Sequence, residues 1–527
     1  MQALAPLTER FNRDIKGIIE CYDRIVLFGT YKAIGWPGAM EGCLRAEGVA
    51  LLDYTRVFAN SLRLKMAAHV REEARRAGVE IRQVNWSERK EAVVEEILHR
   101  RGRHEGVVCV PGAMERCRTF KAGKNRGTGF LELQWSAGKC QHFYIYFIER
   151  ELGLYYLRIP AWAPFRLQFY CNGHDWLERR MKAKGLRFKK AGNCFTRISD
   201  FGKAQALAAE FDPRRVHRIL DKAAARWVAV HRQFGPTLHW SIYQAERATD
   251  IVFKNDNVLP DLYAEITRTA ACEAGCADIY RFLGKRQNSR SKAEVSSRLQ
   301  TLLQGTRIKH TLGATSLKMY DKAGVVLRIE CPTRDVKSFT HYRKVEPRRS
   351  PGATARKPAD KAGSAACGPR AKAPGRKQAP MRKTLYSLPA LSEAMRAVNR
   401  RYLTHISQWR DRTKERHDLR RLTASVRDDK QRSHRGLNFF REEDLQFMQA
   451  LLRGEHHLQG LRTRTLGQHL PGWSAAKTGR ALRRFRVHGL LKRVAGTHKY
   501  YLTKRGSASL VAGRQLVERL VLPALAA

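Results

Sequence analysis

The chain has 527 residues, with 100 Lys and Arg against 49 Asp and Glu, and a formal net charge of +51 at pH 7. Few soluble enzymes carry so large an excess, because like charges repel in a compact state unless a polyanion neutralises them. The 43% of hydrophobic residues can build folded cores, and the length allows about three or four domains. Composition therefore excludes a disordered basic tail.

The basic charge is distributed unevenly. Residues 1–100 contain 16 basic and 14 acidic side chains, whereas residues 301–400 contain 22 and 6, and residues 401–527 contain 27 and 10. The near-neutral beginning is suited to packing, or to self-association into a homo-oligomer. The excess further along indicates a long track for a nucleic acid, with DNA favoured and a structured RNA as the alternative. The other interpretation is a basic surface that serves solubility.

The sequence shows no targeting or membrane segment. Its beginning lacks a basic stretch followed by a long apolar one, and no stretch reaches about 18 uncharged apolar residues. We expect a cytoplasmic protein without a membrane partner, associated with the nucleoid if it binds DNA. Cys272 and Cys276 are expected to be helix residues, because structural zinc normally needs four ligands and no second pair accompanies them.

The opening region alternates apolar strands with amphipathic helices. The pattern predicts strands at residues 25–29, 79–84 and 106–110 and helices at residues 54–77 and 89–100. This alternation favours an α/β layer domain over residues 1–125. The region contains no glycine-rich phosphate loop, so we expect no Walker-type nucleotide site there.

The next region has a two-residue period, typical of antiparallel strands. It predicts strands at residues 130–135, 142–148, 154–159 and 165–170, then a helix near residues 175–184. Residues 200–305 are mostly helical in pattern, apart from an extended segment near residues 238–253. We therefore expect a basic α+β core with an antiparallel sheet over residues 126–345.

One face of that sheet is a candidate base-stacking surface. Tyr144 and Tyr146 share a face, and Arg158 and Arg166 lie on neighbouring strands. Aromatic rings between cations can stack the bases of a single strand. The alternative is that the tyrosines cover the polar side of a half-buried sheet.

Residues 346–383 are rich in Pro, Gly, Ala, Lys and Arg and nearly free of bulky apolar residues, which predicts a flexible basic linker. A charged helical segment is expected over residues 384–440, and a compact module over residues 441–527. The whole chain is thus predicted to be an α+β multidomain protein.

The last module has the element order of a DNA-binding domain. Helices are predicted at residues 444–453, 461–470 and 474–488, with short strands at residues 490–494 and 498–502. This order resembles the winged helix-turn-helix of MarR-like regulators, and the resemblance implies that the third helix and the wing grip duplex DNA. The alternative is a helical hairpin beside an unrelated β-hairpin.

Within the expected recognition helix, we predict that Ala476, Ala481, Leu482 and Phe485 face the core. The cations expected to contact nucleic acid are Lys477, Arg480, Arg483, Arg484 and Arg486 in the helix, with Arg493, Lys499 and Lys504 on the wing.

Residues 313–330 are the sharpest chemical candidate. They predict two strands with a turn at Ala323 and Gly324, and they contain Tyr320-Asp-Lys322 before Arg328-Ile-Glu330. This segment resembles that of rolling-circle replication initiators of mobile elements, whose tyrosine attacks a DNA phosphate and becomes linked to it. The resemblance implies that Tyr320 is the nucleophile, Lys322 stabilises phosphorane charge, and Glu330 binds a metal or orients a group. The alternative is a hairpin edge without chemistry.

Such nicking enzymes use a divalent cation, so Mg²⁺ or Mn²⁺ is expected only if this alternative holds. The paired histidines that commonly hold this metal, separated by one residue, do not occur in the chain. Substitute ligands are sought in His239, Glu246 and Asp250, or in His310 and His341. The sequence thus predicts a nucleic-acid-binding protein, with single-strand nicking as the alternative.

Overall fold

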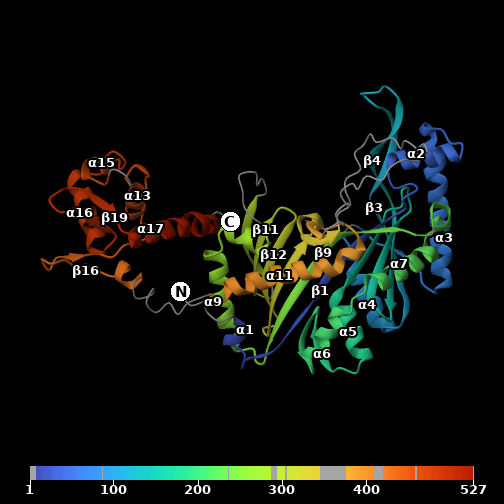
Figure 1. The fold of residues 1–527 in the computed structure, drawn as a ribbon, viewed down its shortest axis with the longest axis horizontal. Coiled ribbons are helices and arrows are strands. Elements are labelled where there is room, and N and C mark those ends of the chain that lie inside the picture. Colours follow the sequence, from blue (N-terminus) through green and yellow to red (C-terminus); the bar gives the residue numbers. More distant parts are fainter. Residues whose placement is uncertain are drawn as a thin grey trace, which may run out of the picture. The chain divides into compact units, whose positions relative to one another are not determined.

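The computed structural model describes residues 7–85, 87–235, 237–285, 294–302, 305–344, 376–408, 419–456 and 460–525. The chain divides into two compact units, Met1–Trp409 (unit 1) and Arg410–Ala527 (unit 2) (Figure 1). Helices and strands occur in both, which confirms the expected α+β class. None of the helices in the described part combines the length and apolar character needed to cross a membrane.

Unit 1 is built on one sheet with the strand order β10-β11-β12-β13-β9-β1-β6-β5-β4-β3-β2. Neighbouring strands are antiparallel, except that β2 and β3 are parallel. The bounds are β1 Ile15–Thr30, β2 Ile81–Gln83, β3 Gly106–Lys124, β4 Leu131–Glu149, β5 Gly153–Pro160, β6 Leu167–Asn172, β9 His239–Phe253, β10 Val295–Leu302, β11 Gly305–Leu312, β12 Thr315–Lys322 and β13 Val326–Thr333.

The same strand order occurs twice in this sheet. β1 is followed by the meander β3 to β6, whose last strand returns to pair with β1, and β9 is followed by the meander β10 to β13, whose last strand returns to pair with β9. β1 and β9 pair antiparallel at the centre. The two halves of the sheet therefore share one topology.

The expected separation of an N-terminal domain at residue 125 does not occur. β1 lies at the centre of the sheet, and residue 125 falls in the turn between β3 and β4. Local periodicity could not reveal this, because β1 pairs with β9 more than 200 residues later. Residues 295–302, expected to be helical, form strand β10.

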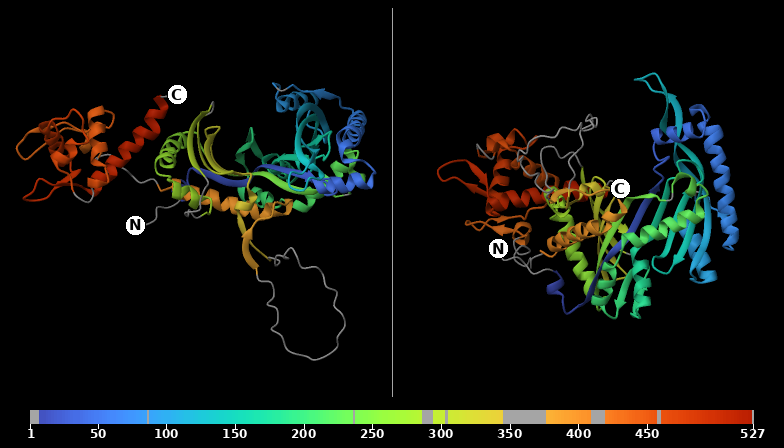
Figure 2. Two further views of the ribbon diagram at one scale, coloured as in Figure 1. Left: turned by 90° about the horizontal axis from the view of Figure 1, so that it is seen from above. Right: turned by 45° about the vertical axis from the view of Figure 1, so that its right-hand side comes forward.

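Helices cover the apolar side of this sheet. Asn399 of α11 donates hydrogen bonds to the carbonyl oxygens of Arg247 and Ile329 on β9 and β13, and Figure 2 shows α11 along that side. The main helices are α2 Pro37–Ala46, α3 Asn60–Arg76, α4 Lys90–Arg101, α5 Gly173–Ala183, α6 Phe201–Ala209, α7 Pro213–Trp227, α9 Val258–Cys272, α10 Cys276–Phe282 and α11 Leu388–Ile406. Thr249 of β9 faces α11, so its neighbour Asp250 faces the other side, because side chains alternate along a strand. We call that side, which carries Asp23, Glu246, Asp250, Tyr320 and Arg328, the polar face.

The region between the sheet and unit 2 also differs from expectation. Residues 346–375 of the expected linker lie outside the described residues, but Arg376–Pro380 form β15, which pairs with β14, Thr340–Lys344. The expected helical segment over residues 384–440 is divided, because α11 belongs to unit 1 and a small hairpin, β16 Val426–Arg427 and β17 Ser433–His434, lies in unit 2.

Unit 2 follows the predicted element order. Its elements are α13 Glu442–Leu451, α15 Thr463–Gly467, α16 Ala475–Val487, β18 Leu491–Arg493, β19 Tyr500–Leu502 and α17 Lys504–Leu516. Phe447, Leu482, Phe485 and Leu510 are buried together in its core. Ser474 caps the N-terminus of α16, because its side chain accepts a hydrogen bond from the Lys477 amide.

Candidate functional site

A buried arginine organises a charged cluster on the polar face of unit 1. Arg328 of β13 is fully buried and donates to both carboxylate oxygens of Asp250, at 2.6 Å each. It also lies 3.2 Å from an oxygen of Asp23 and donates to the carbonyl oxygen of Asn193 at 2.7 Å. A buried guanidinium is stable only where anions and acceptors surround it, and this one is surrounded.

The carboxylates beside Arg328 are held in their charged form. Burial alone would raise the pKa of Asp250, but the charge of Arg328 and the hydrogen bonds it receives hold that pKa below its usual range. At Asp23, burial is likewise outweighed by a hydrogen bond with His174 and by nearby positive charges, which lower its pKa. Both carboxylates are therefore ionised at neutral pH.

Tyr320 lies on β12 opposite Arg328 and is linked to Glu330. Its hydroxyl donates a hydrogen bond to the Glu330 carboxylate. Burial and the charge of Glu330 raise the pKa of Tyr320, so its hydroxyl is protonated at neutral pH. Burial and the charge of Asp23 raise the pKa of Glu330, which makes it a stronger proton acceptor than an exposed carboxylate. The pair thus has the arrangement of a nucleophile beside its base.

Two lysines lie beside this pair. Lys318 Nζ is 3.4 Å from Glu330 and 3.6 Å from Glu246. Lys322 Nζ lies 6.0 Å from the centre of the Tyr320 ring and donates to the Asn193 side chain. Burial and the charge of Arg328 lower the pKa of Lys322. The structure therefore brings together Tyr320, Lys322 and Glu330, the three residues that the sequence selected.

Three carboxylates converge next to Tyr320. One oxygen from each of Asp23, Glu246 and Glu330 lies within 4.8 Å of the other two, and all three residues are buried. An all-oxygen donor set of this kind suits Mg²⁺ or Mn²⁺. The residues present therefore fit the expected metal, with ligands from β1, β9 and β13.

This set differs from the expected ligands. Of those, Glu246 alone belongs to it; both carboxylate oxygens of Asp250 accept hydrogen bonds from Arg328. His239 is exposed at the start of β9, about 36 Å along the strand from Asp250. His310 lies on the opposite side of the sheet, with its ring nitrogen 3.1 Å from the hydroxyl of Tyr402 in α11, and His341 belongs to β14 outside the large sheet.

Sequence reasoning missed Asp23, His174 and Asn193. Asp23 sits at a bulge of β1, and the other two come from the start of α5 and the hairpin that follows it. No local pattern marks them as partners of Tyr320. Asp23 and Glu20 are the two acidic residues of a mainly apolar strand that also contains Lys16 and Arg24, and this was the available signal.

The aromatic part of the polar face differs from the predicted one. Tyr144 and Tyr146 are buried against Val94 and Leu98 of α4, so their rings are not exposed for stacking. Arg158 is near Glu115, at 3.4 Å. The predicted stacking surface is therefore closed at these positions by α4; the sequence predicted this helix at residues 89–100, but not its packing against the tyrosines.

Other rings and cations of the polar face are partly exposed. The Arg166 guanidinium lies 3.9 Å from the centre of the Phe28 ring, and the ring centres of Phe28 and Tyr243 are 4.5 Å apart. Tyr156 and Tyr170 stack at 5.1 Å, with Arg24 5.7 Å from the Tyr170 ring. Arg24 in turn lies 3.9 Å from Glu246, so the stacked rings of Tyr156 and Tyr170 lie next to the cluster of three carboxylates.

In unit 2, α16 presents a row of exposed cations. Arg480, Arg483 and Arg486 recur every third residue, are exposed, and have no ion-pair partner in the described part of the chain. A groove of about 650 Å³ between the end of α16 and the wing is lined by Arg486, Lys492 and Arg493, among other residues. This face has the charge that a phosphate backbone requires.

The other residues predicted to act in unit 2 differ in whether their side chains are free to contact DNA. Arg484 is buried and bonded to Asp444, so it is a structural residue. Lys477 pairs with Glu443 at 2.8 Å. Lys504 is exposed and Lys499 is half-buried. Ala481, Leu482 and Phe485 are buried as predicted, whereas Ala476 is exposed because it lies in the first turn.

Comparison of the chain with protein-family models, with curated proteins and with solved structures gave no match. The functional argument therefore depends on the residues and their geometry.

Proposed function

We propose that this protein binds nucleic acid, and that unit 2 binds duplex DNA through α16 and the wing. The observation that carries the proposal is the exposed row Arg480, Arg483 and Arg486 beside the basic groove. Residues 453–514 contain 14 Lys and Arg and one acidic residue, so this surface has few carboxylates to compete with phosphates. Unit 1 adds cations and partly exposed rings suited to a single strand.

The test is direct binding of the full-length protein to fluorescent duplex DNA, single-stranded DNA and duplex RNA at low and moderate salt. We expect duplex DNA to bind, with an affinity that falls steeply as salt rises. A preference for RNA would transfer the proposal to the structured-RNA alternative. Lack of binding to all three at low salt would contradict it.

We propose as a second function that Tyr320 cleaves a single DNA strand. The specific observation is the hydrogen bond from Tyr320 to Glu330, next to two further carboxylates and two lysines. The Tyr320 hydroxyl is therefore in contact with a group that can accept its proton.

In this reaction, the Tyr320 oxygen attacks the phosphorus, and its proton passes to Glu330. The bond from phosphorus to the leaving sugar oxygen breaks, and that oxygen takes a proton from water, so the strand ends linked to the protein. Lys322 stabilises the negative charge that develops on the phosphate oxygens. A divalent ion bound by Asp23, Glu246 and Glu330 would supply Lewis-acid polarisation of the phosphate.

A labelled pool of single-stranded DNA, incubated with the protein and Mg²⁺ or Mn²⁺, tests this function. We expect a DNA-linked protein band that survives denaturation in the native chain and is lost in Tyr320→Phe. Tyr342→Phe is the matched control, since Tyr342 is exposed on β14, outside the large sheet and away from the carboxylates. An adduct that persists in Tyr320→Phe contradicts cleavage by Tyr320 and leaves the DNA-binding proposal intact.

A further inference from the structure

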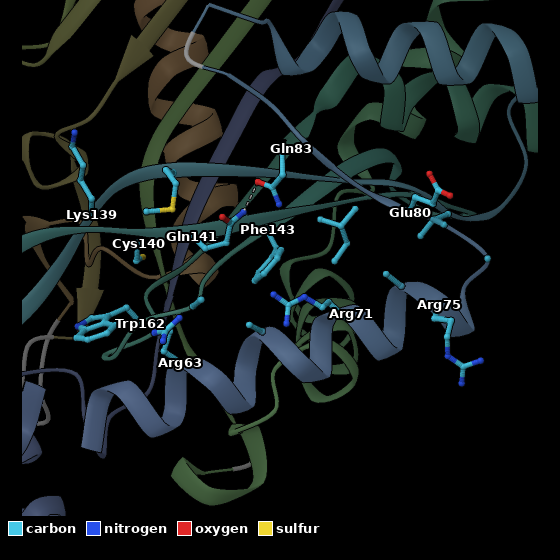
Figure 3. Close-up of a pocket in the computed structure, with 17 residues that line it drawn as sticks. Arg63, Arg71, Arg75, Glu80, Gln83, Lys139, Cys140, Gln141, Phe143 and Trp162 are labelled. Carbon is cyan, nitrogen blue, oxygen red and sulfur yellow. Dashed lines mark hydrogen bonds between the residues drawn. The ribbon is translucent and has the colours of Figure 1, made fainter. Parts of the chain in front are cut away.

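A groove in unit 1 has no role in either proposed function. It has a volume of about 900 Å³ and lies between α3 and strands β2 to β4, at the edge of the sheet (Figure 3). Sites for small ligands typically enclose roughly 300–1,000 Å³. The Tyr320 cluster lies on β12 and β13, in the other half of the sheet.

The groove is positively charged on its helical side. Arg63, Ala67 and Arg71 recur every fourth residue along α3, so they share the face that lines the groove. Figure 3 shows the guanidinium groups of Arg63 and Arg71 directed toward the strands, whereas Arg75 points away.

These two arginines are open to an anion. Among the described residues, the Arg63 side chain has one hydrogen bond, from Nε to the Asn60 side chain at 3.0 Å. Arg71 has neither an ion pair nor a hydrogen bond from its side chain within the described residues, whereas Arg75 pairs with Glu72 at 2.9 Å. Two guanidinium groups that face a concave surface favour a phosphate, which can accept several of their hydrogen bonds.

The strand side of the groove offers an aromatic surface and an amide edge. The Trp162 ring is fixed by a hydrogen bond from Nε1 to Thr119 at 2.8 Å, and it is partly exposed at the groove. Gln141 Nε2 donates to Gln83 Oε1 at 3.1 Å. This bond leaves the Gln83 amide nitrogen as a donor and the Gln141 amide oxygen as an acceptor, side by side.

We propose that this groove binds a nucleotide. The phosphate contacts Arg63 and Arg71, the base packs against Trp162, and the base edge bonds to Gln83 and Gln141. A nucleotide combines the three features that the groove meets: negative charge, a flat ring and an edge with donors and acceptors. It is either a free mononucleotide or one nucleotide of a longer strand.

Equilibrium dialysis of the full-length protein tests the proposal with three probes: deoxynucleoside monophosphates, inorganic phosphate and a short 5′-phosphorylated oligodeoxynucleotide. We expect Arg71→Gln to weaken nucleotide binding about tenfold or more, the value of one lost charged hydrogen bond. Trp162→Leu should weaken nucleotide binding but leave phosphate binding unchanged. Lys65→Gln, on an exposed part of the same helix outside the groove, is the control and should bind as the native chain does.

Each outcome decides the matter. Mononucleotide binding that depends on Arg71 supports a free nucleotide as the ligand, and Arg71-dependent binding of the oligonucleotide alone supports a nucleotide of a strand. Absence of both, equal binding in Arg71→Gln, or phosphate competing as well as a nucleotide overturns the proposal. Circular dichroism confirms that the variants fold. An α16 variant should retain nucleotide binding, so this proposal and the DNA-binding proposal fail separately.

Discussion

The salt dependence of DNA binding gives a quantitative test of the α16 surface. Replacement of Arg480, Arg483 and Arg486 by Gln removes three positive charges, and because all three are exposed the core of unit 2 is unchanged. Each phosphate contact contributes about 0.9 to the slope of log affinity against log salt, so three contacts contribute about 2.7. At about 0.15 M salt the same relation gives a loss of about a hundredfold in affinity.

The assay is fluorescence anisotropy of a labelled duplex, titrated with the full-length protein at several salt concentrations. The matched control replaces three exposed cations elsewhere in unit 2, Arg427, Lys430 and Arg519, by Gln. We expect the control to keep the native slope. An unchanged slope in the α16 variant, or an equal loss in both variants, would refute the placement of DNA on α16.

Three further predictions concern the stability of unit 1. Arg328→Met leaves Asp250 and Asp23 buried without their cation, so urea titration should show a loss of about 3–5 kcal/mol in the free energy of unfolding; a loss below about 1 kcal/mol would contradict the role of Arg328. Gly173→Ala places a Cβ 1.9 Å from the Tyr22 carbonyl oxygen, and this overpacking should lower the melting temperature, at a cost of about 1–3 kcal/mol. The pKa values of Asp23 and Asp250 are lower in the folded protein than in the unfolded chain, where an aspartate titrates at about 3.9. The two ionised carboxylates therefore stabilise the fold above pH about 3.9, and the free energy of unfolding should fall as the pH drops below that value. A free energy of unfolding that stays constant down to pH about 2 would contradict this.

The sequence predicted the elements of the sheet better than their assembly. The strands around residues 142–148 and 154–159 were predicted because two types of residue alternate along each of them, although only the second strand is buried on one face alone. Their membership in one sheet with β1 and β9 was not, because that pairing joins residues more than 200 positions apart. Periodicity reports which side of an element is buried but not which distant element buries it.

The residues of the candidate site also differ in whether local sequence could predict that they lie together. Tyr320 and Glu330 lie on the two strands of one hairpin, so a single segment of sequence contains both. Asp23 comes from another strand, and its place next to Tyr320 depends on the order of the whole sheet. Arg484 looked like a DNA contact because cations surround it in sequence, but Asp444 lies beneath it in the fold.

The repeated topology of the sheet separates two kinds of surface on the polar face. In the second half, Tyr320, Arg328 and Asp250 occupy facing positions of three adjacent strands, and their charges compensate one another in a buried cluster. In the first half, the corresponding strands β5, β6 and β1 place Tyr156, Tyr170 and Val26 at facing positions. One half thus holds groups suited to proton transfer, and the other holds rings suited to contact with bases. A single strand of nucleic acid that lay along the polar face would meet the rings of one half and Tyr320 of the other, because β1 and β9 join the two halves directly.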